Sequence, residues 1–184
     1  MNKVDLIYQD FVNYKDKKSH SKTNKDEPHL IYGEITKEGI EKLVNEINFS
    51  PNDVVLDIGS GRGKGICHLS LITNVKKLIG VEIMEERHNL ALSLVNSGDY
   101  GNVEFLCKDI FDCLPIIEDS TIIIANLLAF PKDLAQKLLN MIPKGKTIIL
   151  STTLNKNSIQ GSVRELHLSV SWLDKEFKFY VIKT

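Results

Sequence analysis

The fold is decided by residues 54–65, which read Val54-Val55-Leu56-Asp57-Ile58-Gly59-Ser60-Gly61-Arg62-Gly63-Lys64-Gly65. The apolar run at residues 54–58 predicts a buried strand, and residues 63–72 predict the helix that follows it. The glycines between them let the backbone turn tightly and let a ligand approach, because no Cβ atoms stand in the way. The stretch therefore predicts a strand–turn–helix unit with a ligand site at the turn.

Strands and helices alternate along the chain around this unit. The other expected strands cover residues 78–82, 103–106, 121–125 and 147–151, and the other central helices cover residues 85–95 and 133–141. Apolar spacing predicts a further helix capped by Thr36 and a short one near the N-terminus, over Val4 to Val12. Continuous apolar strands that alternate with helices predict a parallel sheet covered on both faces.

The C-terminal part changes its pattern to a period of two. Apolar residues alternate with mostly polar ones in two runs separated by residues 173–176, which predicts an antiparallel hairpin. The alternating residues are Leu166, Leu168, Val170 and Trp172, then Phe177, Phe179 and Val181. We therefore expect residues 1–184 to form one α/β domain, a doubly wound and mostly parallel sheet closed by a C-terminal hairpin.

Composition excludes several classes of protein. The 184 residues, 42% hydrophobic and 26% charged, suit one ordinary soluble domain. A net charge of -1 gives no general attraction to nucleic acid or to an anionic membrane, although residues 15–27 carry five lysines. Neither the three cysteines nor the five histidines have metal-ligand spacing, so no metal is expected. We expect a soluble intracellular protein, cytoplasmic or nuclear, without a signal peptide or a membrane span.

Three ligand patterns compete for the glycine turn. A phosphate-binding P-loop requires glycine at Ile58 and a hydroxyl at Gly65, and a dinucleotide site requires glycine at Lys64. The acid Asp57 at the strand end instead gives the pattern D-x-G-x-G with Gly59 and Gly61. A carboxylate there suits a cationic sulfonium ligand with an amino-acid tail, because it lies near the ligand's ammonium.

Two more acids follow the next two strands. Glu82 ends the second strand, where an acid accepts the hydroxyls of a ribose. Asp109 follows the third strand, where it can accept the amino group of an adenine while Ile110 or Phe111 packs on the ring. Because the carboxyl ends of parallel strands meet at one edge of a sheet, all three acids are expected in one ligand crevice.

At these residues, from about Ile31 to the C-terminus, the sequence resembles the disruptor-of-telomeric-silencing (Dot) type of histone lysine methyltransferases. Tyr32-Gly33-Glu34 looks like that family's cofactor-closing loop, and residues 57–63 are similar to its glycine motif. Residues 124–130, Ile124-Ala125-Asn126-Leu127-Leu128-Ala129-Phe130, resemble its fourth-strand motif. Ser169-Val170-Ser171-Trp172 resembles part of its final hairpin. The sequence departs from the family at Leu127 and Leu128 and at Phe179, which aligns with a tyrosine.

The resemblance implies a class I, Rossmann-like methyltransferase that uses S-adenosylmethionine to methylate lysine in a protein, a histone or another basic protein. The implied catalytic residues are an asparagine that orients the nucleophile or holds the methionine end of the cofactor, and aromatic walls of a channel for the lysine: Asn126, Phe130, Phe179 and Tyr180, with Trp172 beside them. The implied cofactor residues are Tyr32, Gly33, Glu34, Asp57, Gly59, Ser60, Gly61, Gly63, Glu82, Asp109, Ile110 and Asn126. An apolar channel lowers the pKa of an entering amine.

Two alternatives remain open at this point. The first is a methyltransferase that acts on a small molecule or RNA, although Leu127-Leu128 after Asn126 lacks the proline pair of N6-adenine enzymes. The second is a domain that binds cofactor or a protein partner without catalysis. We expect a monomer with no strong nucleic-acid binding.

Overall fold

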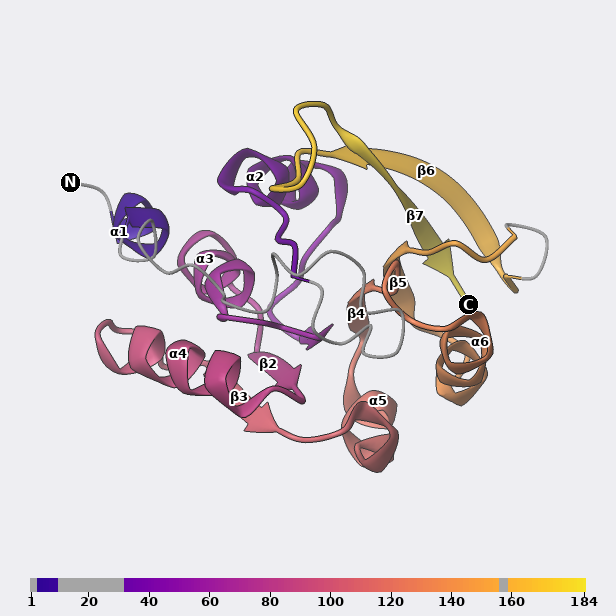
Figure 1. Cartoon of the computed structure of the whole chain (residues 1–184), viewed down its shortest axis with the longest axis horizontal. Helices are drawn as coiled ribbons and strands as arrows, with labels where there is room; N and C mark the ends of the chain where they lie inside the picture. Colours follow the sequence, from indigo (N-terminus) through magenta and orange to yellow (C-terminus); the bar gives the residue numbers. More distant parts are fainter. Residues whose placement is uncertain (1–2, 10–31, 156–158) are drawn as a thin grey trace.

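The computed structural model describes residues 3–9, 32–155 and 159–184, and in that part of the chain one seven-stranded sheet has the order β3-β2-β1-β4-β5-β7-β6 (Figure 1). Five strands pair in parallel: β1 (Val54–Ile58), β2 (Lys77–Glu82), β3 (Val103–Cys107), β4 (Ile122–Asn126) and β5 (Thr147–Ser151). The hairpin β6 (Ser162–Leu168) and β7 (Phe177–Lys183) completes the sheet, with β7 antiparallel to both neighbours. The predicted doubly wound α/β fold with a closing hairpin is confirmed.

Helices cover both faces of this sheet (Figure 1). One face carries α1 (Lys3–Gln9), α2 (Lys37–Glu46), α3 (Lys64–Ile72) and α4 (Glu85–Asn96). The other carries the 3-10 turn η2 (Ile110–Asp112), α5 (Leu114–Asp119) and α6 (Lys132–Met141). Thr36 caps α2 as predicted, because its Oγ1 accepts the N–H of Gly39 at 3.2 Å.

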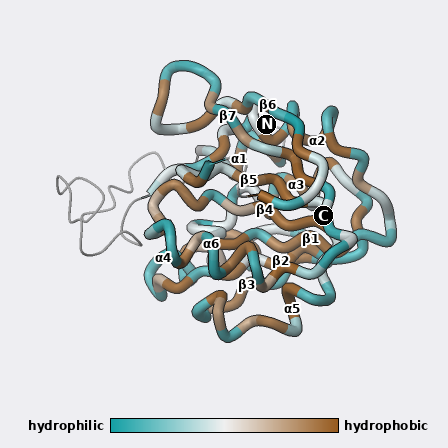
Figure 2. Tube along the Cα trace, turned by 90° about the vertical axis from the view of Figure 1, so that its right-hand side faces the viewer, coloured by the Kyte–Doolittle hydropathy of each residue, from teal (hydrophilic) through white to brown (hydrophobic). Residues whose placement is uncertain are grey.

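Two hydrophobic clusters hold the layers together, one on each face. Successive strand residues point to opposite faces, so Val55 joins the cluster under α2 and α3 while Leu56 joins the one under α5 and α6. Figure 2 shows the hydrophobic stretches along the labelled strands in the middle of the molecule and hydrophilic stretches at its periphery. Burial on both faces explains why the central strands are continuously apolar.

Several local expectations differ from the structure. The strand β6 ends at Leu168, because residues 169–171 leave the hairpin and pair with residues 34–36. The turn η2 and the helix α5 were not predicted, since neither is long enough to show a helical period. Of the predicted N-terminal segment, residues 10–12 and the lysine-rich run at residues 15–27 lie outside the described residues.

Candidate active site

A cavity of about 520 Å³ opens at the carboxyl ends of the parallel strands. The strand order reverses between β1 and β4, and a ligand crevice of an open α/β sheet forms at such a switch point. Most of the predicted cofactor residues line it, namely Tyr32, Gly33, Glu34, Asp57, Gly59, Ser60, Gly61, Glu82, Asp109, Ile110 and Asn126. The structure thus brings together residues spread over about 95 positions of the sequence.

The glycine turn shapes the floor of this cavity. Gly61 has a φ of +56°, and a Cβ there would lie 2.7 Å from the ring of Tyr32. Gly63 has a φ of +76°, and a Cβ there would lie 2.4 Å from Phe105 and 2.9 Å from Ala91. Gly63 was predicted to contact the cofactor, but it is absent from the cavity lining. A glycine is needed at position 63 because the turn packs closely against β3 and α4 there.

Glu82 ties the glycine turn to the end of β2. Its side chain is buried, and its Oε2 accepts the N–H of Gly61 at 2.9 Å while its Oε1 accepts the N–H of Met84 at 2.8 Å. A carboxylate has lone pairs for further hydrogen bonds beyond these two. Glu82 is therefore held in one orientation and can still accept hydroxyl groups from a ligand in the cavity.

Asp57 lies on the cavity wall at the end of β1. Burial and, to a lesser extent, the negative charge of Glu82 raise the pKa of Asp57 to about 7. A positively charged group in the cavity would stabilise the ionised form of Asp57. The pair therefore favours a cationic ligand over a phosphate at this end of the cavity.

Asp109 and Ile110 follow β3 at the other side of the cavity. The Asp109 carboxylate accepts the N–H of Phe111 at 3.0 Å and so caps η2, while the Ile110 side chain is buried in the core below. Phe111 and Ile83 also line the cavity, and Ile83 is 52% exposed. An acid beside apolar side chains suits a purine base, because the acid can accept the amino group while the apolar side chains pack on the ring.

The Tyr32–Ile35 segment, the predicted cofactor lid, lies along residues 169–171 after β6. Glu34 N–H donates to Ser171 Oγ at 2.9 Å, and Ser171 N–H donates to the Glu34 carbonyl at 2.9 Å. Gly33 has no room for a side chain, because a Cβ would lie 2.4 Å from the Trp172 ring. The two segments that resemble family motifs therefore fit against each other.

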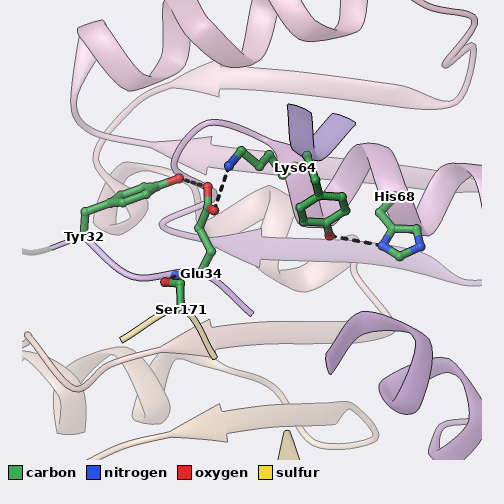
Figure 3. A network of polar contacts seen from close by, with 6 residues as sticks. Tyr32, Glu34, Lys64, His68 and Ser171 are labelled. Atoms are coloured by element: carbon green, nitrogen blue, oxygen red, sulfur yellow. Dashed lines mark hydrogen bonds and ion pairs between the residues drawn. The ribbon is translucent and has the colours of Figure 1, made fainter. Parts of the chain in front are cut away.

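A polar network fixes the side chains of this lid (Figure 3). The Glu34 carboxylate accepts the hydroxyl of Tyr32 and forms an ion pair with Lys64 at 3.0 Å. Lys64 is at the first position of α3 and lines the cavity. The sequence analysis missed it as a site residue, although its place directly after the glycine turn was the available signal.

Next to this network, α1 contacts α3 through aromatic side chains (Figure 3). The Tyr8 hydroxyl lies 3.1 Å from His68 Nδ1, and the Lys64 ammonium lies 5.9 Å from the Tyr8 ring. Burial lowers the pKa of His68 to about 4, so this imidazole is neutral near pH 7. His68 supports the packing of α1 on α3.

By chemistry, the cavity lining divides into an acid-lined half, with Asp57, Glu82 and Asp109, and an apolar half; Asn126, at the end of β4, lines the same cavity. Ser151 at the end of β5 donates its hydroxyl to Asn126 Oδ1, so the NH₂ end of the amide is the one that can donate to a ligand. The apolar half is lined by Leu128, Ala129, Phe130, Pro131, Leu134 and Trp172. Phe130 therefore lies where the sequence predicted an aromatic wall.

Phe179 and Tyr180, predicted as channel walls, are not among the residues that line the cavity, so their part in the channel stays a prediction. Phe179 is fully buried in the cluster under α2 and α3, and Tyr180 is buried in the cluster under α5 and α6. The reason is the place of β7, which lies between β5 and β6 with helices or loops over both faces. Alternating residues of an interior strand are buried on both sides.

In residues 3–9, 32–155 and 159–184 there is no group of three or more His, Cys, Asp or Glu side chains that could hold a metal ion. Within the same ranges no helix has the length and apolarity to cross a membrane.

The family model for "Histone methylation protein DOT1" matches residues 8–166 of this chain, which include the glycine turn, all three acids and Asn126. The chain belongs to this family. The chain is similar to the H3 lysine-79-specific histone-lysine N-methyltransferase of Caenorhabditis elegans, with 26% identity over 82% of this chain, and it spans 19% of that relative's length. A second relative of this DOT1-family chain is a protein-lysine N-methyltransferase of Saccharolobus islandicus, with 27% identity over 67% of this chain and 76% of the relative.

Solved structures confirm the class I methyltransferase fold of this DOT1-family chain. An RNA methyltransferase from Salinibacter ruber, solved with S-adenosyl-L-homocysteine, matches with a TM-score of 0.63 and 18% identity, over 82% of this chain and 94% of that one. Membership of the family implies S-adenosylmethionine as the cofactor. The donor set fits it, since Asp57 suits the ammonium, Glu82 the ribose hydroxyls and Asp109 the adenine amino group.

Proposed function

We propose that residues 1–184 form a methyltransferase domain that transfers the methyl group of S-adenosylmethionine to a lysine side chain of a protein, a histone or another basic protein. The observation that carries the proposal is the continuity of one cavity. The lining that contains Asp57, Glu82 and Asp109 also contains Asn126 and the apolar side chains of Phe130 and Trp172. An apolar lining beside a cofactor site suits an aliphatic amine better than a planar guanidinium or a nucleobase.

The bound cofactor supplies an electrophilic methyl group on a sulfonium that is a good leaving group. The protein's main task is therefore to position the two reactants in line and to exclude water. Asp57 and Glu82 hold the cofactor from the acid-lined half, and the Asn126 amide donates to a group in the same cavity. These roles require no general base when the acceptor amine arrives deprotonated, because the sulfonium leaves as a neutral thioether.

The acceptor amine must enter in its neutral form, although the free lysine pKa is about 10.4. Burial against Leu128, Phe130 and Trp172 disfavours the ammonium form, and the nearby sulfonium charge acts in the same direction. Rate at saturating cofactor should therefore rise with pH between about 7 and 9 until the bound amine is fully deprotonated.

The test is transfer of isotope-labelled methyl groups by the purified chain to free core histones, nucleosomes, native lysate proteins, total RNA and a small-molecule extract. Mass spectrometry then identifies the methylated residue type. We expect methyl-lysine on protein. Free histones should be accepted and nucleosomes should not be required, because a net charge of -1 gives the chain little affinity for nucleosomal DNA.

A matched pair of variants controls this test. Phe130→Ala should abolish most transfer while cofactor still binds, and Phe49→Ala, at a partly buried ring outside the cavity lining, should not. Methyl groups on RNA, a metabolite or arginine would contradict the lysine assignment. Cofactor binding with no transfer to any acceptor would instead support a non-catalytic domain, and transfer to nucleosomes alone would contradict the acceptance of free histones.

A further inference from the structure

Two arginine side chains lie over the ring of Tyr32. The guanidinium carbon of Arg62 is 4.5 Å from the ring centroid, and that of Arg87 is 4.8 Å from it. Arg62 belongs to the glycine turn, whereas Arg87 is on α4, the helix that follows Glu82. Both arginines are 6% exposed, so they are largely shielded from water, while Tyr32 is half-buried and lines the cavity.

The hydroxyl of the same ring holds the rest of the lid. It donates to the Glu34 carboxylate, which also pairs with Lys64 at 3.0 Å. The edge of the ring lies against Gly61, where an added Cβ would be 2.7 Å from the ring. Tyr32 thus joins the glycine turn and α4 by its ring and the lid by its hydroxyl.

Cations are attracted to the face of an aromatic ring, and the attraction is stronger when both groups are shielded from water. Two guanidinium groups would repel each other without compensation. Here the ring lies in contact with both of them, and the carboxylates of Glu34 and Glu82 lie on the same cavity. The arrangement favours the closed position of Tyr32 over any position in which the ring leaves the stack.

We infer that Arg62 and Arg87 are positioning residues that act as a clamp by packing on the ring of Tyr32, and that this clamp holds the lid closed over the cofactor site. Arg87 lines the cavity, but Arg62 does not. A change at Arg62 therefore acts on the lid and not through a contact with the ligand. This inference rests on the proposed function for its link to cofactor, but the closed lid itself can be measured without ligand.

The main experiment compares Arg62→Met with the wild-type chain by amide hydrogen exchange in the absence of ligand. The reporters are the N–H groups of Glu34, Thr36 and Ser171, which close the lid on residues 169–171. We expect exchange at these three to become about 10-fold faster, the change that corresponds to loss of a shielded cation–π contact. Arg62→Lys keeps the charge and should recover part of the protection.

Arg164→Met is the matched control, because Arg164 is exposed, pairs with Glu46 and does not line the cavity. It should leave exchange at the three reporters unchanged. Thermal unfolding checks that each variant is folded. If Arg62→Met does not fold, Arg87→Met is measured against the same reporters, and unchanged exchange in a folded clamp variant overturns the inference.

A double-mutant cycle with Tyr32→Leu separates the clamp from a general loosening of the glycine turn. Once the ring is removed, Arg62→Met should add less than about 2-fold to the exchange rate, because neighbouring residues act through one shared interaction. A full 10-fold further increase would show that Arg62 acts without Tyr32 and would overturn the clamp.

The link to cofactor is measured as the affinity for S-adenosylhomocysteine and as the steady-state constants. We expect a roughly 10-fold weaker affinity and a raised KM for the cofactor in Arg62→Met, with a much smaller change in kcat. A wild-type chain that fails to bind the ligand would refute the proposed function, while the ligand-free exchange data still decide the clamp. Faster exchange with unchanged affinity would overturn the role of the clamp in binding.

Discussion

The acid-lined half of the cavity and its apolar half are built in different ways. Asp57, Glu82 and Asp109 each end or follow a parallel strand, so the topology of the sheet alone brings them to one edge. The apolar half takes Phe130 from a loop after β4 and Trp172 from a segment after the hairpin strand β6. Functional residues at the ends of strands can therefore be predicted from sequence, whereas the residues of a cavity wall that depend on side-chain packing cannot.

The largest expected effect tests which aromatic residues belong to the apolar half. Phe179→Ala removes a fully buried ring from the core and should lower the free energy of unfolding by about 3–5 kcal/mol, measured by denaturant titration. Phe179→Leu should lower it by less than about 1.5 kcal/mol and leave the KM values unchanged. A raised KM for the acceptor in the folded Phe179→Leu variant would show that Phe179 contributes to the channel wall.

The next effect tests the acid-lined half. Glu82→Ala should weaken S-adenosylhomocysteine binding by about 3 kcal/mol or more, over 100-fold, because two charge-assisted hydrogen bonds to the ribose are lost. Removal of the bond to the Gly61 N–H adds to this by loosening the glycine turn. Glu104→Ala, an exposed acid on β3 paired with Lys77, is the control in the same calorimetric titration. Equal affinities of the two variants would exclude Glu82 from the cofactor site.

A third prediction concerns the pH dependence of the ligand-free chain. The folded state keeps the proton of Asp57 up to about pH 7, whereas an unfolded aspartate releases it near pH 3.9, so stability falls as pH rises between these values. Asp57→Asn removes this loss and should be more stable than wild type at pH 8, with a smaller gain at pH 5. The same variant should bind S-adenosylhomocysteine about 10-fold more weakly.

Thermal unfolding at the two pH values measures the first part of this prediction, and calorimetry measures the second. A gain in stability that is equal at pH 5 and pH 8 would show that Asp57 is ionised over the whole range. An unchanged affinity for S-adenosylhomocysteine would show that the Asp57 carboxylate does not contact the ligand's ammonium.

The smallest effect tests the role of Asn126. Ser151→Ala removes one hydrogen bond that orients the Asn126 amide, worth about 0.5–1.5 kcal/mol, so kcat should fall by about 2- to 12-fold. Ser120→Ala is the control, because that buried hydroxyl binds the Ile116 carbonyl. A change in cofactor affinity without a change in kcat would assign Asn126 to the acid-lined half alone.

Sequence reasoning was most successful where local rules decide the structure. The strands that carry Asp57 and Glu82, the glycine turn and the Thr36 cap follow from apolar runs, backbone freedom and capping. It did not anticipate the burial of Tyr180, because alternation along a strand does not reveal that the strand lies inside a sheet with both faces covered. It also missed Arg62 and Arg87, since a stack on a ring depends on side chains from separate segments meeting in space.

The position of β7 has a consequence for how the protein is made. β7 is synthesised after β6 but lies between β5 and β6, so the sheet edge at β5 stays unpaired until residues 177–183 have been made. An unpaired edge is prone to pairing with other chains during that time. The segment at residues 169–171, which aligns the lid, lies between the two hairpin strands. During synthesis on the ribosome the lid is therefore expected to assemble later than the glycine turn, because its partner segment is made more than 100 residues after that turn.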